Sequence, residues 1–209
     1  MVDQVPASEA PGSRKRADAR KNEATLLEAA AAAFVASGVD VPVRDIAQRA
    51  GVGIGTIYRH FPTRADLIVG VYRHQVEACA AAGPALLASS SSPHAALAHW
   101  IHLFVDFLVT KHGLAAALQS DEAAFDSLHT WFLETLVPVC AELLAATAAA
   151  GEIHPGQDAL ELMYGIGNLC IGVERNPSYD PRHMVDLVIA GLRVQAEECT
   201  ARRGGPSAT

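Results

Sequence analysis

Residues 43–67, VRDIAQRAGVGIGTIYRHFPTRADL, constrain the fold of this chain more than any other segment, because they have the spacing of a helix-turn-helix. Apolar residues recur there at i, i+3, i+4 and i+7, which predicts a short helix with one buried face. These apolar residues are Val43, Ile46, Ala47 and Ala50. Gly51 then supplies a sharp turn. A second short helix is predicted from about Ile54 to Phe61, with Ile57 and Phe61 facing the first.

The second helix of this pair has an outward face that suits the major groove of DNA. It combines little bulk at its beginning with hydroxyl groups and cations further on, which can hold phosphates. The outward residues are Gly53, Ile54, Thr56, Tyr58, Arg59 and His60. Similar units also occur inside helical proteins where they only pack, so the spacing alone leaves DNA binding and internal packing both open.

Residues 46–67 resemble the DNA-binding segment of the TetR family, the tetracycline-repressor-like regulators. The resemblance rests on Ile46-Ala47, Ala50-Gly51-Val52, Thr56-Ile57-Tyr58, His60-Phe61, Arg64 and Leu67. One departure lies just before the first helix, where many members have Ser or Thr and this chain has Val41-Pro42. Proline suits a first helical turn, whose N–H groups are unpaired in any case, so the helix is expected even without a hydroxyl cap.

The resemblance and the chemistry of the side chains together indicate which residues read the bases. Arg44 is expected at a guanine edge or a phosphate, Ile54 at a thymine methyl group, and Thr56 at a base or a phosphate. Gly53 and Gly55 are expected to let the backbone approach the groove.

The same resemblance implies which residues hold the DNA backbone. The family positions with this role correspond here to Tyr58, His60 and Arg64, and Arg59 is a further phosphate or flanking contact. Tyr58 has a competing role in packing, because half of its ring is apolar. Loss of each phosphate contact is expected to lower the salt dependence of binding by about one unit.

Charge is distributed unevenly along the chain, which carries a net charge of −7. Residues 14–64 hold nine basic and five acidic side chains, whereas residues 74–209 hold six and fifteen. Only the N-terminal quarter is therefore expected to meet phosphate, and repulsion of the acidic remainder helps to orient the encounter. The cluster Arg14-Lys15-Arg16 with Arg20 and Lys21 is either a solvated helix start or an arm that follows the DNA.

The remaining sequence predicts an all-α protein, in which an N-terminal three-helix DNA-binding domain precedes a larger helical bundle. The expected divisions are a tail at 1–13, the helix-turn-helix domain at 14–73, an effector-binding and dimerisation domain at 74–200, and a tail at 201–209. Helices are expected at 18–37, 64–82, 93–112, 114–118, 121–150, 157–175 and 181–199, with Gly83-Pro84 and Gly113 as breaks. Thr63 and Asp66 are expected to cap the fourth helix.

The resemblance implies a homodimer formed by the last two helices. Two-fold pairing would place two recognition helices about 34 Å apart, one on each half of a palindromic operator. The apolar stripes of these helices also suit the core of a monomer. The residues expected at the interface are Gly165, Leu169, Gly172, Met184, Leu187, Val188 and Gly191.

A small-molecule cavity in the second domain is also implied by the resemblance. It further implies a repressor that an apolar or aromatic effector releases from DNA. The residues expected to line the cavity are Trp100, His102, Phe104, Phe107, Phe125, His129, Trp131, Phe132, Met163, Tyr164 and Asn168. Large side chains of this kind equally suit an ordinary hydrophobic core, so each has packing as its alternative role.

Other functions have little support in the sequence. The four cysteines lack metal-finger spacing and are expected to be buried thiols in a reducing compartment. His99 and His102 are one helical turn apart but lack a third ligand, so no metal or other cofactor is expected. The chain has no phosphate loop, nucleophile elbow or HExxH motif, which argues against an enzyme, and a purely structural module would not need the exposed DNA-facing set.

The sequence also predicts a cytoplasmic protein without a membrane partner. Asp3 and Glu9 lie in an N-terminus that lacks the apolar stretch of a signal peptide. Glu134 and Glu142 interrupt the longest apolar segment, so no uncharged run reaches the ~18 residues expected of a membrane span.

Overall fold

The computed structural model describes the backbone of residues 11–118, 122–171 and 178–193, and the side chains of residues 21–109, 126–171 and 178–193. Within these ranges the chain is all-helical, with one isolated bridge between Ile153 and Arg193. The chain divides into two compact units, Met1–His74 and Gln75–Thr209. Helix α4 (Arg64–Ser89) contributes residues to both units.

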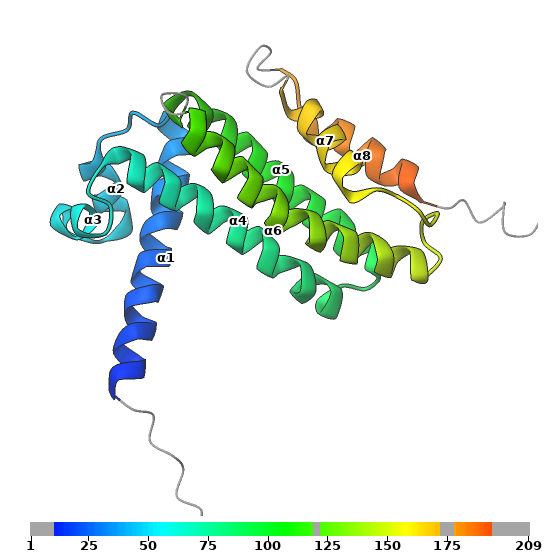
Figure 1. The fold of residues 1–209 in the computed structure, drawn as a ribbon, viewed down its shortest axis with the longest axis horizontal. Coiled ribbons are helices and arrows are strands. Elements are labelled where there is room, and N and C mark those ends of the chain that lie inside the picture. Colours follow the sequence, from blue (N-terminus) through cyan, green and yellow to red (C-terminus); the bar gives the residue numbers. More distant parts are fainter. Residues whose placement is uncertain (1–10, 119–121, 172–177, 194–209) are drawn as a thin grey trace, which may run out of the picture. The chain divides into compact units, whose positions relative to one another are not determined.

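The first unit consists of α1 (Pro11–Ser37), α2 (Val43–Ala50), α3 (Ile54–His60) and the first turns of α4. Figure 1 shows α2 and α3 as two short helices next to one another. The core of the unit is apolar and draws on all four helices, which explains why the short helices are stable here although they would not be in isolation. Its buried residues include Leu26, Leu27, Ala30, Phe34, Ile46, Ala47, Ile57, Leu67 and Val71.

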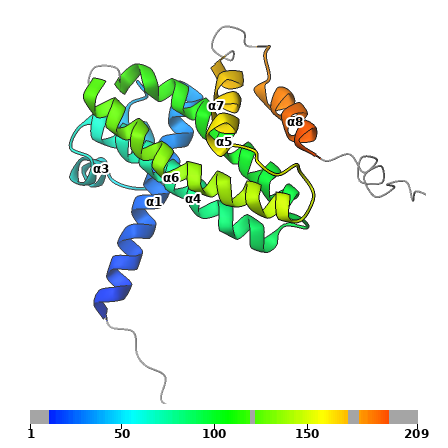
Figure 2. The same ribbon diagram turned by 45° about the vertical axis from the view of Figure 1, so that its right-hand side comes forward.

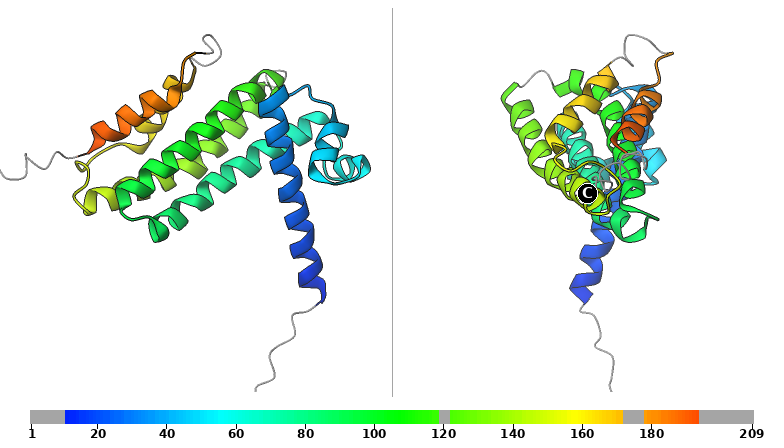
Figure 3. Two further views of the ribbon diagram at one scale, coloured as in Figure 1. Left: turned by 180° about the vertical axis from the view of Figure 1, so that it is seen from behind. Right: turned by 90° about the vertical axis from the view of Figure 1, so that its right-hand side faces the viewer.

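The second unit adds α5 (Pro93–Leu118), α6 (Glu122–Ala149), α7 (Ala159–Cys170) and α8 (Pro181–Leu192) to the remainder of α4. Helices α5 and α6 run side by side, and α7 packs against both (Figures 1 and 2). Helix α8 contacts α5 and α7. Figure 3 shows the same ribbon from behind and from the side.

A stack of aromatic rings fills the centre of the second unit. The rings of Trp100 and Phe104 are stacked with centroids 5.7 Å apart, and Phe104 and Phe132 are 6.1 Å apart. The indole N–H of Trp100 donates to the backbone carbonyl of Cys79 over 2.9 Å. This bond satisfies the polar group of a fully buried tryptophan and fixes α4 on α5.

The starts of α1 and α4 can be compared with the sequence prediction. Helix α1 begins at Pro11, earlier than the predicted start at residue 18 and inside the segment expected to be a tail. Proline is well suited to a first helical position, and the basic cluster that follows contains no helix-breaking residue. The capping box of α4 is confirmed, since Thr63 Oγ1 donates to the Asp66 carboxylate over 2.7 Å and the Asp66 N–H bonds Thr63 Oγ1 over 3.1 Å.

The predicted break at Gly83-Pro84 is wrong, because α4 continues to Ser89 with Pro84 inside the helix. A proline there removes one helical hydrogen bond, which normally favours a stop. Gly83, however, lies against α6: a Cβ atom on it would overlap Val139 Cγ1 and stand 3.8 Å from Leu143 and Trp100. Close packing of the helix on its neighbours therefore offsets the cost of the proline.

Other predicted helix ends also need correction. Gly113 does not end α5, which continues to Leu118, because one glycine costs only about 1 kcal/mol among the strong helix formers that follow it. Helix α8 ends at Leu192 rather than near residue 199, because the backbone of Arg193 turns extended and pairs with Ile153. The helix end predicted near residue 175 lies outside the described residues. The predicted tail at 201–209 lies outside the described residues.

One described helical segment, Asp126–Ala149 of α6, is long and apolar enough to cross a membrane by length and composition, with a mean hydropathy of 1.5. In this fold it packs against α5 and α7. Leu136, Cys140 and Leu143 on its inner face are completely buried. The segment is a core helix of the bundle.

Candidate functional site

The helix-turn-helix is held together by the small and apolar residues that the sequence predicted for it. Ala47 on α2 and Ile57 on α3 are only 4% and 1% exposed, so the two helices cross closely. Gly51 ends α2 with a left-handed backbone, at φ 67°, and the N–H of Val52 then donates to the Ala47 carbonyl over 3.0 Å. The predicted turn at Gly51 is confirmed.

Most of the residues predicted to contact DNA lie at the surface of this motif. Ile54 and Tyr58 are its large apolar side chains, 46% and 49% exposed, and Thr56 is half-buried. The other exposed members are Arg44, Gly53, Gly55, Arg59 and His60. Apolar, hydroxyl and cationic groups are therefore all accessible on this motif, the mixture that base edges and phosphates require.

Gly53 and Gly55 are not needed by the fold itself. A Cβ atom on either residue would meet no atom within 4 Å, and neither residue has a positive φ. Gly55 lies inside α3, where glycine is less stable than alanine by about 1 kcal/mol. The missing side chains leave the beginning of α3 clear for a close approach from outside the chain.

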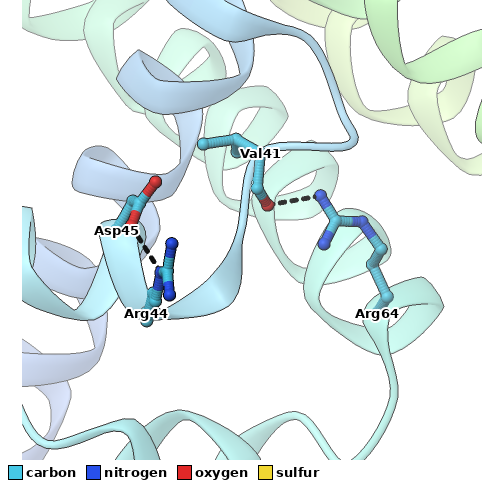
Figure 4. Close-up of polar contacts among 4 residues, drawn as sticks. All are labelled: Val41, Arg44, Asp45 and Arg64. Atoms are coloured by element: carbon cyan, nitrogen blue, oxygen red, sulfur yellow. Dashed lines mark hydrogen bonds and ion pairs between the residues drawn. The ribbon is translucent and has the colours of Figure 1, made fainter.

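Arg44 projects from α2 into solvent with 80% of its side chain exposed (Figure 4). Its Nε donates to the carboxylate of the neighbouring Asp45 over 3.3 Å. An ion pair this exposed contributes little to stability, so Arg44 can exchange the carboxylate for another acceptor at small cost. The negative charge of Asp45 nevertheless lies beside the face that is predicted to meet phosphate.

The contacts of Arg64 differ from those that the sequence predicts. The sequence predicts a phosphate contact, but the guanidinium turns inward and Nη2 donates to the backbone carbonyls of Val39 and Val41. The bond to Val41, over 2.7 Å, is drawn in Figure 4. Both carbonyls belong to the loop between α1 and α2. Sequence spacing places Arg64 on α4 but gives no sign of a loop that lies more than twenty residues earlier in the chain.

Five of the residues predicted to line an effector cavity surround one cavity of about 100 Å³ between α5, α6 and α7. These residues are Phe104, His129, Phe132, Met163 and Tyr164. The prediction missed four further lining residues, which are Leu108, Leu133, Leu160 and Gly167. Each of the four lies three or four positions from a predicted residue on the same helix, so helical spacing was the signal that would have found them.

The other residues predicted for the cavity lie elsewhere. Trp100 is completely buried in the core, and Phe107 faces a separate groove of about 220 Å³ between α4 and α5. His102 pairs with Asp186 of α8 across 3.0 Å. Neither Trp131, which is half-buried, nor Asn168, which is exposed, lines this cavity. The side chain of Phe125 lies outside the described residues.

Several large apolar residues of α7 and α8 are exposed. In the described part of the chain, five of the eight large hydrophobic residues with the highest exposure belong to α7, to its C-terminal end or to α8. They are Leu160, Tyr164, Ile171, Met184 and Leu187. Of the other residues predicted for a dimer interface, Gly165 and Gly191 are exposed, Leu169 and Val188 are half-buried, and Gly172 lies outside the described residues.

The described residues contain no group of three His, Cys, Asp or Glu side chains that could hold a metal ion. Burial raises the pKa of the Cys79 and Cys140 thiols to about 12 and that of Cys170 to about 11. These three thiols are therefore protonated at neutral pH and unreactive as nucleophiles.

A helix-turn-helix with an exposed second helix, followed by a separate helical unit, defines the class of DNA-binding regulators to which this chain belongs. Residues 26–71 match the family described as bacterial regulatory proteins, tetR family. Residues 92–194 match the family described as the C-terminal domain of SbtR-like transcriptional regulators. The chain belongs to the TetR family of transcriptional regulators, which are not enzymes.

Solved structures of other transcriptional regulators agree with this assignment. A TetR transcriptional regulator from Streptomyces coelicolor is 32% identical, with 83% of this chain and 99% of that chain covered and a TM-score of 0.75. One from Mycobacterium vanbaalenii is 37% identical, with 86% and 99% covered and a TM-score of 0.63. FadR from Bacillus subtilis, solved in complex with stearoyl-CoA, is 20% identical over 81% and 96% and shares the fold, with a TM-score of 0.55. No curated protein matches this chain.

Proposed function

We propose that this regulator is a cytoplasmic homodimeric repressor that binds a palindromic operator through α2 and α3. A small, largely apolar effector in the second unit releases it from DNA. The observation that carries the DNA-binding part is the bare surface at Gly53 and Gly55, because neither glycine is explained by packing or by turn geometry. Two protomers then place two such surfaces about one turn of DNA apart.

The apolar surface of α7 and α8 supports the homodimer. Leu187 and Tyr164 are 54% and 51% exposed, and clusters of large apolar residues on a monomer usually mark an interaction site. We propose that this surface binds the same surface of a second protomer, because isologous pairing is the commonest arrangement in homodimers. Tyr164 and Leu160 also line the cavity, so a second copy on this face would close the side of the cavity that they form.

The cavity between α5, α6 and α7 supports an apolar effector. Its wall is mainly aromatic and aliphatic, with His129 and Tyr164 as the polar members. At about 100 Å³ it is smaller than the roughly 300–1,000 Å³ of a pocket for a drug-sized ligand. A larger effector therefore binds only a widened form of the bundle, and such differential affinity is what shifts a conformational equilibrium. Stearoyl-CoA in the Bacillus subtilis FadR structure is an example of an acyl ligand in a protein of this fold.

The DNA-binding part is tested by selection of bound sequences from random duplex DNA with the purified protein at two salt concentrations. An enriched palindrome is the expected result. Weak binding without enrichment, with a steep salt dependence that is the same for every sequence, would contradict sequence-specific operator binding. The enriched duplex then serves as the probe for the effector experiment.

The effector part is tested by thermal shift and by operator binding with indole, naphthalene and decanoate as probes. At least one probe is expected to raise the melting temperature and to weaken operator binding. Gly167→Leu should abolish both responses, because its side chain enters the cavity while a Cβ atom at this position meets no atom within 4 Å. The control is Leu133→Met on the same wall, a volume-conserving change. A probe response that survives Gly167→Leu would place the effector elsewhere.

A further inference from the structure

The guanidinium of Arg64 is hydrogen-bonded to the protein's own backbone. Nη2 donates to two carbonyls, those of Val39 and Val41, and Nε is buried without a hydrogen-bond partner among the described residues. Hydrogen bonds from a charged donor are about twice as strong as neutral ones. To reach a phosphate, the side chain would have to release both carbonyls.

The loop that Arg64 holds leads directly into α2. Val41 is buried at 8% exposure and precedes Pro42, the N-cap of α2. Pro42 provides no side-chain acceptor for the first turn, and the N–H groups of Asp45 and Ile46 both bond the Pro42 carbonyl, over 2.9 and 3.4 Å. The beginning of α2 therefore lacks the hydroxyl cap that usually fixes such a turn, so the bonds that hold the preceding loop add to the packing of Ile46 and Ala47 in positioning this helix.

The other end of this link is rigid. Arg64 is the first residue of α4, and the capping box of Thr63 and Asp66 fixes the first turn of that helix. Arg64 thus connects a well-ordered helix start with the backbone immediately before a helix that has no side-chain cap.

We infer that Arg64 is a positioning residue for the DNA-reading helices and does not contact phosphate. From α4 it holds the loop of residues 38–42 and thereby sets the orientation of α2, which carries Arg44 toward DNA. The inference rests on the proposed DNA-binding surface of α2 and α3. It assigns to Arg64 a role different from the backbone contact that its sequence position implies.

The test compares Arg64→Met with Arg59→Met, since Arg59 is an exposed arginine of α3 with a proposed phosphate contact. Both variants are titrated with the selected duplex at several salt concentrations, at a temperature where each is fully folded. Arg64→Met should lose about tenfold in affinity with an unchanged salt slope, whereas Arg59→Met should lose about 0.9 from the slope.

Hydrogen exchange on the free protein gives a second readout that does not depend on DNA. The amides of Asp45 and Ile46 should exchange about tenfold faster in Arg64→Met and at the parent rate in Arg59→Met. A salt slope that falls by about one unit in Arg64→Met would overturn the inference in favour of a phosphate contact. A lower melting temperature with unchanged affinity and unchanged exchange at α2 would also overturn it. If Arg64→Met shows faster exchange but the parent protein binds no DNA, the link between Arg64 and the loop before α2 stands and the proposed function is refuted.

Discussion

Gly70 of α4 lies so close to Phe61 that a Cβ atom on the glycine would stand 2.6 Å from the ring carbon Cε1. Phe61 is the C-cap of α3 and is only 8% exposed. The absence of a side chain at Gly70 therefore lets the C-cap residue of α3 pack directly on α4. This contact and the guanidinium of Arg64 both attach the DNA-reading helices to the first turns of α4.

Gly70→Ala is expected to destabilise the protein. Forcing a methyl group into this contact costs about 1–3 kcal/mol, which exceeds the gain of about 1 kcal/mol in helix propensity. Urea denaturation followed by circular dichroism measures the change. A variant as stable as the parent would show that the Phe61 ring can move aside freely.

Gly55→Ala is expected to weaken operator binding without lowering the stability of the protein. The new methyl group meets no atom within 4 Å in the free protein, so stability should stay equal or rise by up to about 1 kcal/mol. Operator affinity should fall by about tenfold or more, because the methyl group occupies the surface that the DNA must approach. Unchanged affinity would mean that DNA does not come close to this part of α3.

Asp45→Asn is expected to strengthen DNA binding. The change removes a negative charge beside Arg44 and frees the arginine for phosphate, which should make the salt slope steeper by up to about 0.9. The cost is a loss of about 0.3–1 kcal/mol of favourable interaction with the beginning of α2. Glu28→Gln on the exposed face of α1 is the control for a change of net charge alone. Equal gains in DNA affinity for the two variants would mean that the change in net charge, and not the position of Asp45 beside Arg44, strengthens binding.

Leu187→Glu is expected to dissociate the proposed homodimer. A carboxylate on an apolar contact surface must be desolvated on association, which should raise the dimer dissociation constant by at least about a hundredfold. Sedimentation velocity over a range of protein concentrations measures it. Ala149→Glu at the exposed end of α6 is the control. A dimer that tolerates Leu187→Glu would have to use another surface.

The buried thiols of Cys79 and Cys140 predict a loss of stability at high pH. Their pKa is raised from 9.0 to about 12 in the folded protein, so they bind protons more tightly when folded. Their contribution is complete below pH 9 and declines as the pH rises from there toward 12, by roughly 1 kcal/mol per pH unit for each thiol. Urea denaturation under reducing conditions at pH 8, 9.5 and 10.5 should show a smaller decline in the Cys79→Ala, Cys140→Ala double variant. An equal decline in stability in the parent and in the double variant would contradict the assignment of this effect to Cys79 and Cys140.

The sequence predicted the helix-turn-helix closely because its determinants are local. The small residue at Ala47, the turn at Gly51 and the plug at Ile57 interact within ten positions of one another. The family assignment and the all-α fold follow from the same segment and from the helical periodicity of the rest. The capping box at Thr63 is equally local and was equally predictable.

The features that the sequence did not predict depend on distant contacts. Helix α4 continues through Pro84 because Gly83 packs against α6, far along the chain. Arg64 turns inward because the loop before α2 presents two carbonyls to it. The inventory of aromatic residues did not distinguish Phe132, which lines the cavity, from Trp100, which fills the core, since both are large, apolar and helical.

Helix α4 also limits how this regulator can be recombined with its relatives. Its first residue contacts the loop before α2, and Gly83 near its other end contacts α6. A chimera that takes its DNA-binding unit from one parent and its bundle from another therefore needs a crossover point that respects both contacts. A junction within α4 of this chain has to lie between the two contacts, so that Arg64 stays with its own loop and Gly83 stays with its own α6.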